Sequence, residues 1–466
     1  MLVCERHRAE TRLSCAECST PICPQCSIKT PVGFKCPDHA TAPGARRRPR
    51  GKVIGPLVLL AVIVGALSVR ELSISRPVTF PCPSRAAPDV GIGDRGGGLH
   101  WNEMARSPLC GRFNAATAWT GAELLVWGGQ NCAGATCPLD SAPRVADGAA
   151  YNPSTNQWRK LADSPLSARD RAAAAWTGRE LLIWGGTSAD APLADGAAYD
   201  PARNSWRPLA TSPLPARGEP VAVWTGESMV VWGGDEAADG AAYDPAADAW
   251  RPMAPAPLSA RAGATHAWTG REVLVWSGAA SSLTANGEAL PDGALYDPSR
   301  DTWRRMAASP LAGRVAPSSV WTGEELVVWG GNPGAPAVFA VFADGAAYNP
   351  TTDTWRRIAP SPVAGRAGAV TVWNGTEVVL WGGLGLADPA VPLPGLEPRL
   401  EGGIVPLGDG AAFNPAANAW RRLERSSLLA RAYALGAWDG EGLIVWGGLV
   451  AVDSPASAAD GARYVP

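Results

Sequence analysis

Tryptophan recurs in three registers along this chain, and the repetition constrains the fold more than any other feature of the sequence. All 21 tryptophans lie between Trp101 and Trp446. The first register precedes Thr-Gly or a similar turn, at Trp119, Trp176, Trp224, Trp268, Trp321, Trp373 and Trp438. The second precedes Gly-Gly, or Ser-Gly in one unit, at Trp127, Trp184, Trp232, Trp276, Trp329, Trp381 and Trp446. The third follows polar turn residues, at Trp158, Trp206, Trp250, Trp303, Trp355 and Trp420, with Trp101 as an additional member.

A further marker, DGAAY or a close variant, begins at Asp147, Asp195, Asp239, Asp292, Asp344, Asp409 and Asp460. Successive markers are 44 to 65 residues apart, and repeats of this length are typical of solenoids and propellers. Each unit offers four strand signals, which resemble AAAAWTG, ELLIWGG, DGAAYDP and NSWRPLA in turn. Four antiparallel strands per unit without a helical period predict an all-β fold, a seven-bladed β-propeller.

The Gly-Gly doublets and the spaced Tyr and Trp residues resemble the kelch repeat over residues 99–466. The last unit ends in its third strand, at DGARYVP, whereas residues 99–105 read as a fourth strand that has no blade of its own. We therefore expect residues 99–105 to join the last blade, because an open ring would leave two sheet edges exposed. This closure accounts for the position of Trp101.

An arginine ends every connection between a fourth strand and the next first strand, at Arg112, Arg169, Arg217, Arg261, Arg314, Arg366 and Arg431. In antiparallel blades these connections emerge on the same face as the third-strand aspartates, so seven Arg and seven Asp should surround one mouth. Their equal number favours structural ion pairs. The alternative is a ring of guanidinium groups that binds a carboxylate-bearing peptide or sugar. The kelch resemblance implies that partners bind this face.

The loops between second and third strands differ most between units. The loop is short in the third unit, over residues 235–238, and long in the sixth, over residues 384–408. The long loop is apolar, with Leu386, Val391, Leu393, Leu396, Ile404, Val405 and Leu407. An apolar loop at the edge of a propeller face indicates a contact surface. The alternative is that this loop folds over the mouth of the ring and closes it. We expect specificity to lie in the loops of units one, five and six.

Four cysteines lie beyond residue 80. Cys132 and Cys137 share the loop of the first unit, where they could close a small ring. Cys82 and Cys110 would then connect the linker to the propeller. This is one of three possible connectivities.

Enzymatic interpretations have less support in the sequence. Some kelch propellers are copper oxidases, but that chemistry needs imidazole ligands, and only His100 and His266 lie beyond residue 45. A sugar mutarotase needs an acid/base pair with Arg neighbours, for which Glu219 near Arg217 is the candidate. We expect a binding protein without catalytic residues.

Residues 1–45 predict a small zinc module with eight ligands in four pairs, Cys4 and His7, Cys15 and Cys18, Cys23 and Cys26, Cys36 and His39. Two intervening residues let a turn present both ligands of a pair to one tetrahedral ion, so the set fills two structural Zn²⁺ sites and leaves no open position. The apolar content is small, so metal binding would supply the folding free energy, about 10–16 kcal/mol per site. Residues 4–39 resemble a B-box-type zinc finger. That resemblance implies that pairs one and three share one ion, pairs two and four the other, and that the module docks a protein.

Residues 53–69 form an apolar run without charged side chains and predict a single transmembrane helix. The juxtamembrane segment 46–52 contains five cations, Arg46, Arg47, Arg48, Arg50 and Lys52. The positive-inside rule therefore places residues 1–52 in the cytoplasm and the propeller outside. Cysteine usage agrees, because thiolate ligands suit a reducing cytosol and an even number of other cysteines suits an oxidising exterior.

Residues 1–52 hold ten Lys and Arg against four Asp and Glu, whereas the rest holds 31 against 39. An acidic main domain argues against nucleic-acid binding. With a Pro/Gly-rich linker over residues 70–98, the sequence predicts a single-pass protein of the cell membrane that acts as an interaction scaffold. Its extracytoplasmic propeller would bind a protein or glycan, and its cytoplasmic zinc module would dock a partner protein. The alternative is an extracytoplasmic, mutarotase-like enzyme.

Overall fold

A computed structural model describes residues 100–132, 142–280, 287–334, 340–386, 404–450 and 456–466, and four short strands near the N-terminus. The chain divides into two compact units, Met1–Ile74 and Ser75–Pro466. Every described element is a strand, so the described part of the chain is all-β.

The first unit contains two short antiparallel pairs. Strand β1 (Leu2–Val3) pairs with β2 (Glu10–Thr11), and β3 (Ile28–Thr30) pairs with β4 (Gly33–Lys35). The eight predicted zinc ligands, the apolar run 53–69 and the linker 70–98 lie outside the described residues. Within the described residues, no helix is long and apolar enough to cross a membrane.

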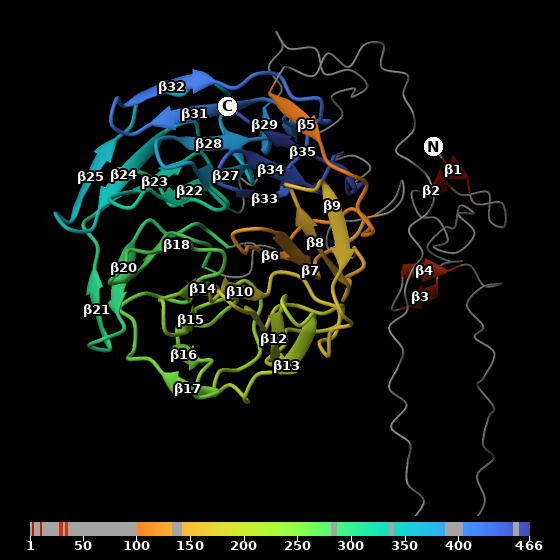
Figure 1. Cartoon of the computed structure of the whole chain (residues 1–466), viewed down its shortest axis with the longest axis vertical. Coiled ribbons are helices and arrows are strands. Elements are labelled where there is room, and N and C mark those ends of the chain that lie inside the picture. Colours follow the sequence, from red (N-terminus) through yellow and green to blue (C-terminus); the bar gives the residue numbers. More distant parts are fainter. Residues whose placement is uncertain are drawn as a thin grey trace, which may run out of the picture. The chain divides into compact units, whose positions relative to one another are not determined.

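The second unit contains seven four-stranded antiparallel sheets among its described residues, and these stand around a ring (Figure 1). We number the sheets as blades 1 to 7 along the chain and their strands A to D from the centre outward. The A strands are β6 (Ala116–Trp119), β10 (Ala173–Trp176), β14 (Val221–Trp224), β18 (Thr265–Trp268), β22 (Ser318–Trp321), β27 (Val370–Trp373) and β33 (Leu435–Trp438). The B strands are β7 (Leu124–Trp127), β11 (Leu181–Trp184), β15 (Met229–Trp232), β19 (Val273–Trp276), β23 (Leu326–Trp329), β28 (Val378–Trp381) and β34 (Leu443–Trp446).

The two outer strands of each blade follow the DGAAY markers and the third tryptophan register. The C strands are β8 (Gly148–Asn152), β12 (Gly196–Asp200), β16 (Gly240–Asp244), β20 (Gly293–Asp297), β24 (Gly345–Asn349), β31 (Gly410–Asn414) and β35 (Gly461–Tyr464). The D strands are β9 (Gln157–Lys160), β13 (Ser205–Pro208), β17 (Ala249–Pro252), β21 (Thr302–Arg305), β25 (Thr354–Arg357), β32 (Ala419–Arg422) and, in blade 7, β5 (Trp101–Glu103).

The position of each strand follows from its side chains. All four residues of every B strand are buried, because these apolar runs lie in the middle of a sheet that neighbouring blades cover on both faces. The A and B strands are joined by tight turns built on glycine. In blade 2, Gly178 has a φ of 90°, and the Thr177 hydroxyl accepts the Glu180 N–H at 2.8 Å. Such a turn reverses the chain within a hairpin.

Blade 7 combines the two ends of the described propeller. Strand β5 pairs antiparallel with β35, with Trp101 opposite Tyr464. The indole of Trp101 lies 5.2 Å from the Tyr464 ring and 5.6 Å from the Trp381 ring of blade 6. Residues 101–103 therefore supply the D strand that the last unit of the sequence lacks, as the closure argument predicts.

Aromatic contacts join each blade to the next. The tryptophan that ends each B strand packs against the D-strand tryptophan of the following blade. The ring centroids of Trp127 and Trp206 are 5.7 Å apart. The Trp206 indole N–H also donates to the Ala162 carbonyl at 2.9 Å. Aromatic pairs of this kind contribute about 0.5–1.5 kcal/mol each beyond the area that they bury. Equivalent pairs occur at all seven junctions, so the core lies between the blades.

Backbone hydrogen bonds near the ring centre connect blades 1 to 4 and blades 5 to 7, and we call the positions that form them the belt. The ring arginines are the seven arginines that end the D–A connections, from Arg112 to Arg431. The belt passes through the residue two positions after each of them. The N–H of Arg171 donates to the Asn114 carbonyl at 3.0 Å, and the N–H of Glu219 donates to the Arg171 carbonyl at 3.0 Å. The belt position has a positive φ in every blade, between 49° and 66°. Gly263, Ala316, Gly368 and Tyr433 occupy it in blades 4 to 7.

Blade 6 carries one further sheet. Strand β26 (Arg366–Ala367) pairs with β29 (Leu384–Leu386), which pairs with β30 (Ile404–Pro406). These strands form the base of the long loop, of which residues 387–403 lie outside the described residues. Leu386 stands opposite Ile404 in the register, so the two ends of the loop are adjacent in space.

Candidate binding face

The seven predicted arginines all lie inside the loops of the face formed by the D–A and B–C connections. Their exposed fractions are between 0% and 2%. Each guanidinium contacts the carboxylate of the aspartate that opens the C strand of its own blade, at distances from 2.7 to 3.1 Å. The sequence therefore identified both partners, and the structure pairs them within a blade.

Arg169 illustrates how the contacts of a ring arginine are arranged. Its Nη1 and Nη2 bind the two carboxylate oxygens of Asp195 at 2.8 and 3.0 Å. Its Nη1 also donates to the Gly185 carbonyl at 3.1 Å, and its Nε donates to the Ser167 carbonyl at 3.0 Å. The backbone carbonyl of Arg169 accepts the Gly129 N–H of blade 1 at 2.8 Å. One residue thus fixes the loops of its own blade and joins them to the preceding blade.

The electrostatics of these pairs are those of a buried cation and a partly solvated anion. Burial lowers the pKa of Arg112, and Asp147 opposes this shift. The hydrogen bond from Arg217 lowers the pKa of Asp239. The seven aspartate side chains are 42% to 61% exposed. A ligand approaching this face would meet these carboxylates and not the seven buried guanidiniums paired with them, so the geometry favours structural ion pairs over a ring of cationic ligand contacts formed by these seven arginines.

A second polar network lies at the belt, between blades 1, 2 and 3. Arg171 binds Glu219 at 2.9 Å and Asp170 at 3.4 Å, and Arg144 binds Asp170 at 3.0 Å. The carboxylates of Asp170 and Glu219 are buried, with 0% and 5% of their side chains exposed. Tyr433 of blade 7 faces the same network, where desolvation raises its pKa and Arg171 opposes the shift. These groups neutralise one another near the ring centre.

The network changes the interpretation of Glu219. The sequence suggested Glu219 as an acid/base candidate near Arg217, but its carboxylate forms an ion pair with Arg171 instead. His100 and His266 lie in different blades. His100 contacts Val465, which follows β35 of blade 7, and Glu424 in the loop after β32. His266 contacts Ala264 in blade 4. Within the described residues, no group of three His, Cys, Asp or Glu side chains could hold a metal ion.

The cysteine predictions are covered only in part by the described residues. Cys110 and Cys132 are each disulfide-bonded. Their predicted partners, Cys82 and Cys137, lie outside the described residues, so the connectivity stays a prediction.

The long loop of blade 6 offers less exposed apolar surface at its base than the sequence suggested. Ile404, Val405 and Leu407 are buried, because β30 packs within the additional sheet. Leu386 at the other side of the base is 50% exposed. Contact with a partner would therefore have to involve Leu386 and residues 387–403.

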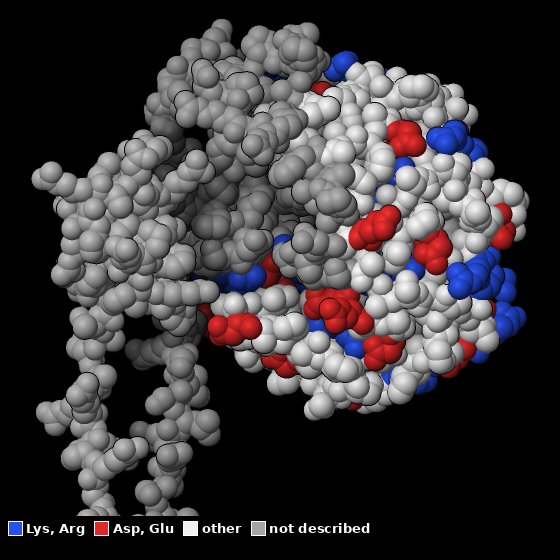
Figure 2. Space-filling view, turned by 180° about the vertical axis from the view of Figure 1, so that it is seen from behind, with Lys and Arg blue, Asp and Glu red and all other residues white. Residues whose placement is uncertain are grey.

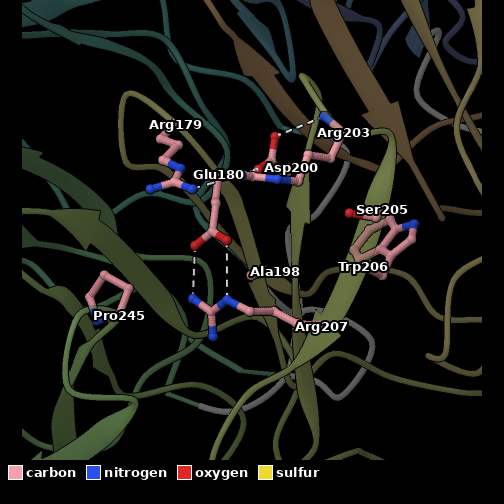
Figure 3. A pocket seen from close by; sticks show the side chains of 9 residues that line it. All are labelled: Arg179, Glu180, Ala198, Asp200, Arg203, Ser205, Trp206, Arg207 and Pro245. Atoms are coloured by element: carbon pink, nitrogen blue, oxygen red, sulfur yellow. Dashed lines mark hydrogen bonds and ion pairs between the residues drawn. The ribbon is translucent and has the colours of Figure 1, made fainter.

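The opposite face, formed by the A–B and C–D turns, has open recesses between neighbouring blades. One of about 370 Å³ lies between blades 2 and 3 (Figure 3). Within it, Arg207 binds both oxygens of Glu180 at 3.1 and 2.8 Å, and Arg203 binds Asp200 at 2.6 Å. A recess of about 880 Å³ between blades 4 and 5 repeats these contacts with Arg304, Glu272, Arg300 and Asp297. In both recesses these Arg, Glu and Asp side chains bind one another, which is typical of a structural surface.

Comparison with known proteins agrees with the fold. Residues 99–269 match the sequence model of the KLHDC2/KLHL20/DRC7 kelch-repeats domain. Together with the four-stranded sheets, this match supports a kelch β-propeller. No curated protein matches the chain. Among solved structures, a fungal alcohol oxidase of the AA5 family in complex with copper matches with a TM-score of 0.58 and 16% identity, over 79% of this chain and 76% of that chain. At this identity the likeness shows a shared fold.

Sequence reasoning missed the belt network. Arg171, Glu219 and Tyr433 of this network occupy one register, two residues after a ring arginine. In this register only glycine occurs twice among the seven units: Asn114, Arg171, Glu219, Gly263, Ala316, Gly368 and Tyr433. Comparing the units at this position would have identified it as the least repetitive place near the ring centre.

Proposed function

We propose that this protein is a membrane-anchored interaction scaffold whose seven-bladed propeller binds a protein partner through the D–A and B–C loops. The kelch-repeat match favours protein interaction in general. The observation that carries the proposal is that the carboxylates and guanidiniums of this face bind one another. Asp170 and Glu219 are buried in ion pairs, and the seven ring arginines are buried in others. A general acid or base would need a pKa near the working pH and access to substrate.

The variable part of this face is its B–C loops. Blade 3 connects its B and C strands through a few residues, whereas blade 6 inserts the strands β29 and β30 and residues 387–403 at the same place. Loops on a rigid scaffold commonly carry specificity, because their sequences can change without disturbing the core. We therefore place the specific partner contact on the blade 6 loop.

A loop exchange in the full-length protein tests this proposal. Residues 387–403 are replaced by Asn-Gly, which can connect Leu386 to Ile404 because these residues are opposite one another in the β29–β30 hairpin. This design keeps β30, whose Ile404 and Val405 are buried, so thermal stability should change little. A matched control shortens the blade 4 loop at residues 281–286.

The readout is the set of proteins captured from native membranes and identified by mass spectrometry. We expect one or a few proteins to be lost with the blade 6 exchange and retained with the blade 4 control. If both variants capture the same proteins as the unchanged chain, the blade 6 loop is not the binding element.

The proposal includes a topology, with residues 53–69 as the transmembrane helix, the propeller outside and the zinc module in the cytoplasm. It rests on the five cations of residues 46–52. Protease added to intact cells should remove the propeller and spare residues 1–52. A propeller that is cleaved only after lysis would reverse the orientation.

A further inference from the structure

We infer that the partner of this face is an acidic protein segment, which binds along an arc of three exposed arginines on blades 4, 5 and 6. This inference rests on the proposed function and names the chemistry of its partner. The basic arc consists of Arg305, Arg357 and Arg422, the last residues of β21, β25 and β32. Figure 2 shows basic side chains along the outer edge of one face, with acidic side chains inside them.

The three side chains of the basic arc have the same environment. They are 62%, 61% and 58% exposed. Each approaches Oδ2 of the aspartate that opens the C strand of its own blade, which we call the ring aspartate. The distances are 3.5 Å for Asp292, 3.5 Å for Asp344 and 3.8 Å for Asp409. These contacts place the three guanidiniums on the D–A/B–C face.

Hydrogen bonds to the preceding D–A connections fix the orientation of these arginines further. Arg305 donates to the Pro257 carbonyl at 2.6 Å, and Arg357 donates to the Pro310 carbonyl at 2.8 Å. Arg422 donates to the Pro362 carbonyl. An arginine has five N–H donors, so donors beyond those in these contacts stay available to a partner. The three arginine side chains are therefore held in a fixed orientation and still have N–H donors for a partner.

Arginine occupies this position in three consecutive blades only. Pro208 and Pro252 occupy it in blades 2 and 3, and Glu103 occupies it in blade 7. Blade 1 has Lys160 there, and Asp147 of that blade has one arginine partner. In blades 4 to 6 each ring aspartate has two arginine partners, whereas in blades 2 and 3 it has one. Each of blades 4, 5 and 6 thus presents one additional positive charge on this face.

A regular spacing of single cations fits a segment that carries several carboxylates. Guanidinium binds carboxylate through paired, charge-assisted hydrogen bonds. An anionic membrane surface fits less well, because the ring aspartates between the arginines are 42% to 45% exposed and would face the same lipids.

Apolar side chains at one end of the arc suit the same partner. Leu386 in blade 6 and Leu429 before blade 7 are 50% and 45% exposed. Their segments lie side by side, because the Arg431 N–H donates to the Leu407 carbonyl and the Leu407 N–H donates to the Gly383 carbonyl. An acidic segment with one apolar anchor could contact both features.

Binding of a fluorescent oligoglutamate peptide to the full-length protein tests the inference. The test variant is Arg305→Gln/Arg357→Gln/Arg422→Gln. The control variant is Arg179→Gln/Arg203→Gln/Arg271→Gln, which removes three arginines of similar exposure, 70%, 65% and 71%, from the turns of the opposite face. Both variants have the same net charge, so a difference between them reports the location of the charges.

We expect the test variant to bind the peptide about tenfold more weakly than the unchanged protein, since three partly exposed charge pairs are lost. The control variant should bind normally, and salt should weaken binding by the unchanged protein. Equal weakening by both variants, or none by the test variant, would overturn the inference. Vesicles containing phosphatidylglycerol provide a further arm. Arc-dependent binding to vesicles without binding to the peptide would replace the acidic segment by a membrane and also overturn it.

Failure of this inference can be told apart from failure of the proposed function. If capture depends on residues 387–403 but is unaffected by the test variant, the scaffold function stands and the basic arc is wrong. If the arc binds the peptide but the loop exchange leaves capture unchanged, the arc stands and the loop assignment is wrong.

Discussion

Ser277 of blade 4 forms two hydrogen bonds with the backbone of Arg314, the ring arginine of blade 5. Its hydroxyl accepts the Arg314 N–H at 2.7 Å and donates to the Arg314 carbonyl at 2.9 Å. The other six blades have glycine at this position. In blade 1, a Cβ on Gly128 would lie 2.9 Å from the Arg169 carbonyl oxygen. Blade 4 thus accommodates a side chain by making that close approach a hydrogen bond.

Replacing Ser277 by alanine should therefore destabilise the propeller. The variant keeps a Cβ at a residue with a φ of 60° and leaves the buried Arg314 N–H without the hydroxyl. Loss of a buried hydrogen-bond partner costs about 1–3 kcal/mol. Ser277→Gly should cost less, because glycine adopts positive φ readily. Urea unfolding of both variants measures the difference, and an alanine variant as stable as the glycine variant would contradict this account.

The two members of a ring pair should respond unequally to substitution. Arg366 is fully buried and donates to the carbonyls of Ala364, Gly382 and Asp409 as well as binding the Asp409 carboxylate, whose side chain is 45% exposed. Arg366→Met should cost about 3–5 kcal/mol, because it leaves the carbonyls of Ala364, Gly382 and Asp409 without this donor, and a buried group without a partner costs about 1–3 kcal/mol. Asp409→Asn should cost less, because Arg366 keeps its three carbonyl acceptors and the asparagine amide oxygen can still accept from the guanidinium. Denaturant titration of the two variants checks the ranking, and equal losses would show that the carbonyl contacts contribute little.

The repeat made most of the propeller predictable. Tryptophans at equal positions have to be equivalent in space, so the four strands, the pairing of Arg with Asp and the closure by Trp101 all followed from register. Each of these depends on a residue that occurs once per unit. The tryptophans that recur at the ends of the B strands and in the D strands are the residues that pack between neighbouring blades.

Features that depend on backbone groups, or that break the repeat, could not be predicted in this way. Burial of the ring arginines depends on carbonyl groups such as that of Gly185, which no side-chain pattern reveals. The contact of Arg171 with Glu219 joins two blades through a register whose residue varies between units. Arg305, Arg357 and Arg422 occupy one register of the sequence, but the orientation of their side chains follows from hydrogen bonds to proline carbonyls.

Trp101 should matter more for ring closure than its counterparts in other blades do. It is 7% exposed and packs against Trp381 and Tyr464. Trp101→Ala should cost about 3–5 kcal/mol, as for other buried aromatic residues. It should also release β5 and expose the edge of β35, which favours association between copies. Trp206→Ala, the equivalent change in blade 2, should reduce stability without association. Light scattering and thermal unfolding distinguish these outcomes, and two monomeric variants would argue against a special role for β5.

Asp297 should contribute stability that is lost in acid. The Ser299 hydroxyl and then Arg300 bind its carboxylate and lower its pKa from 3.8 to about 2. A group with a lower pKa in the folded state stabilises the fold above its unfolded pKa, and this contribution disappears as the pH falls through the folded pKa. The difference in melting temperature between the unchanged protein and Asp297→Asn should therefore be constant above about pH 5 and shrink toward pH 2. A difference that does not change with pH would assign the effect to packing.

The N-terminal module should bind two zinc ions per full-length chain. Its eight ligands form four pairs, and a structural zinc site uses four. Cys15→Ser/Cys18→Ser removes one pair, so the zinc content should fall from about two ions to about one. Serine at Cys110 and Cys132 provides a control, since these two cysteines lie in the propeller and each is disulfide-bonded. Plasma mass spectrometry of the purified proteins gives the metal content, and cobalt substitution shows whether thiolates are ligands. One ion or none in the unchanged chain would refute the eight-ligand assignment. A loss of both ions in the Cys15/Cys18 variant would mean that the two sites fold together, because each ion then depends on the structure that the other maintains.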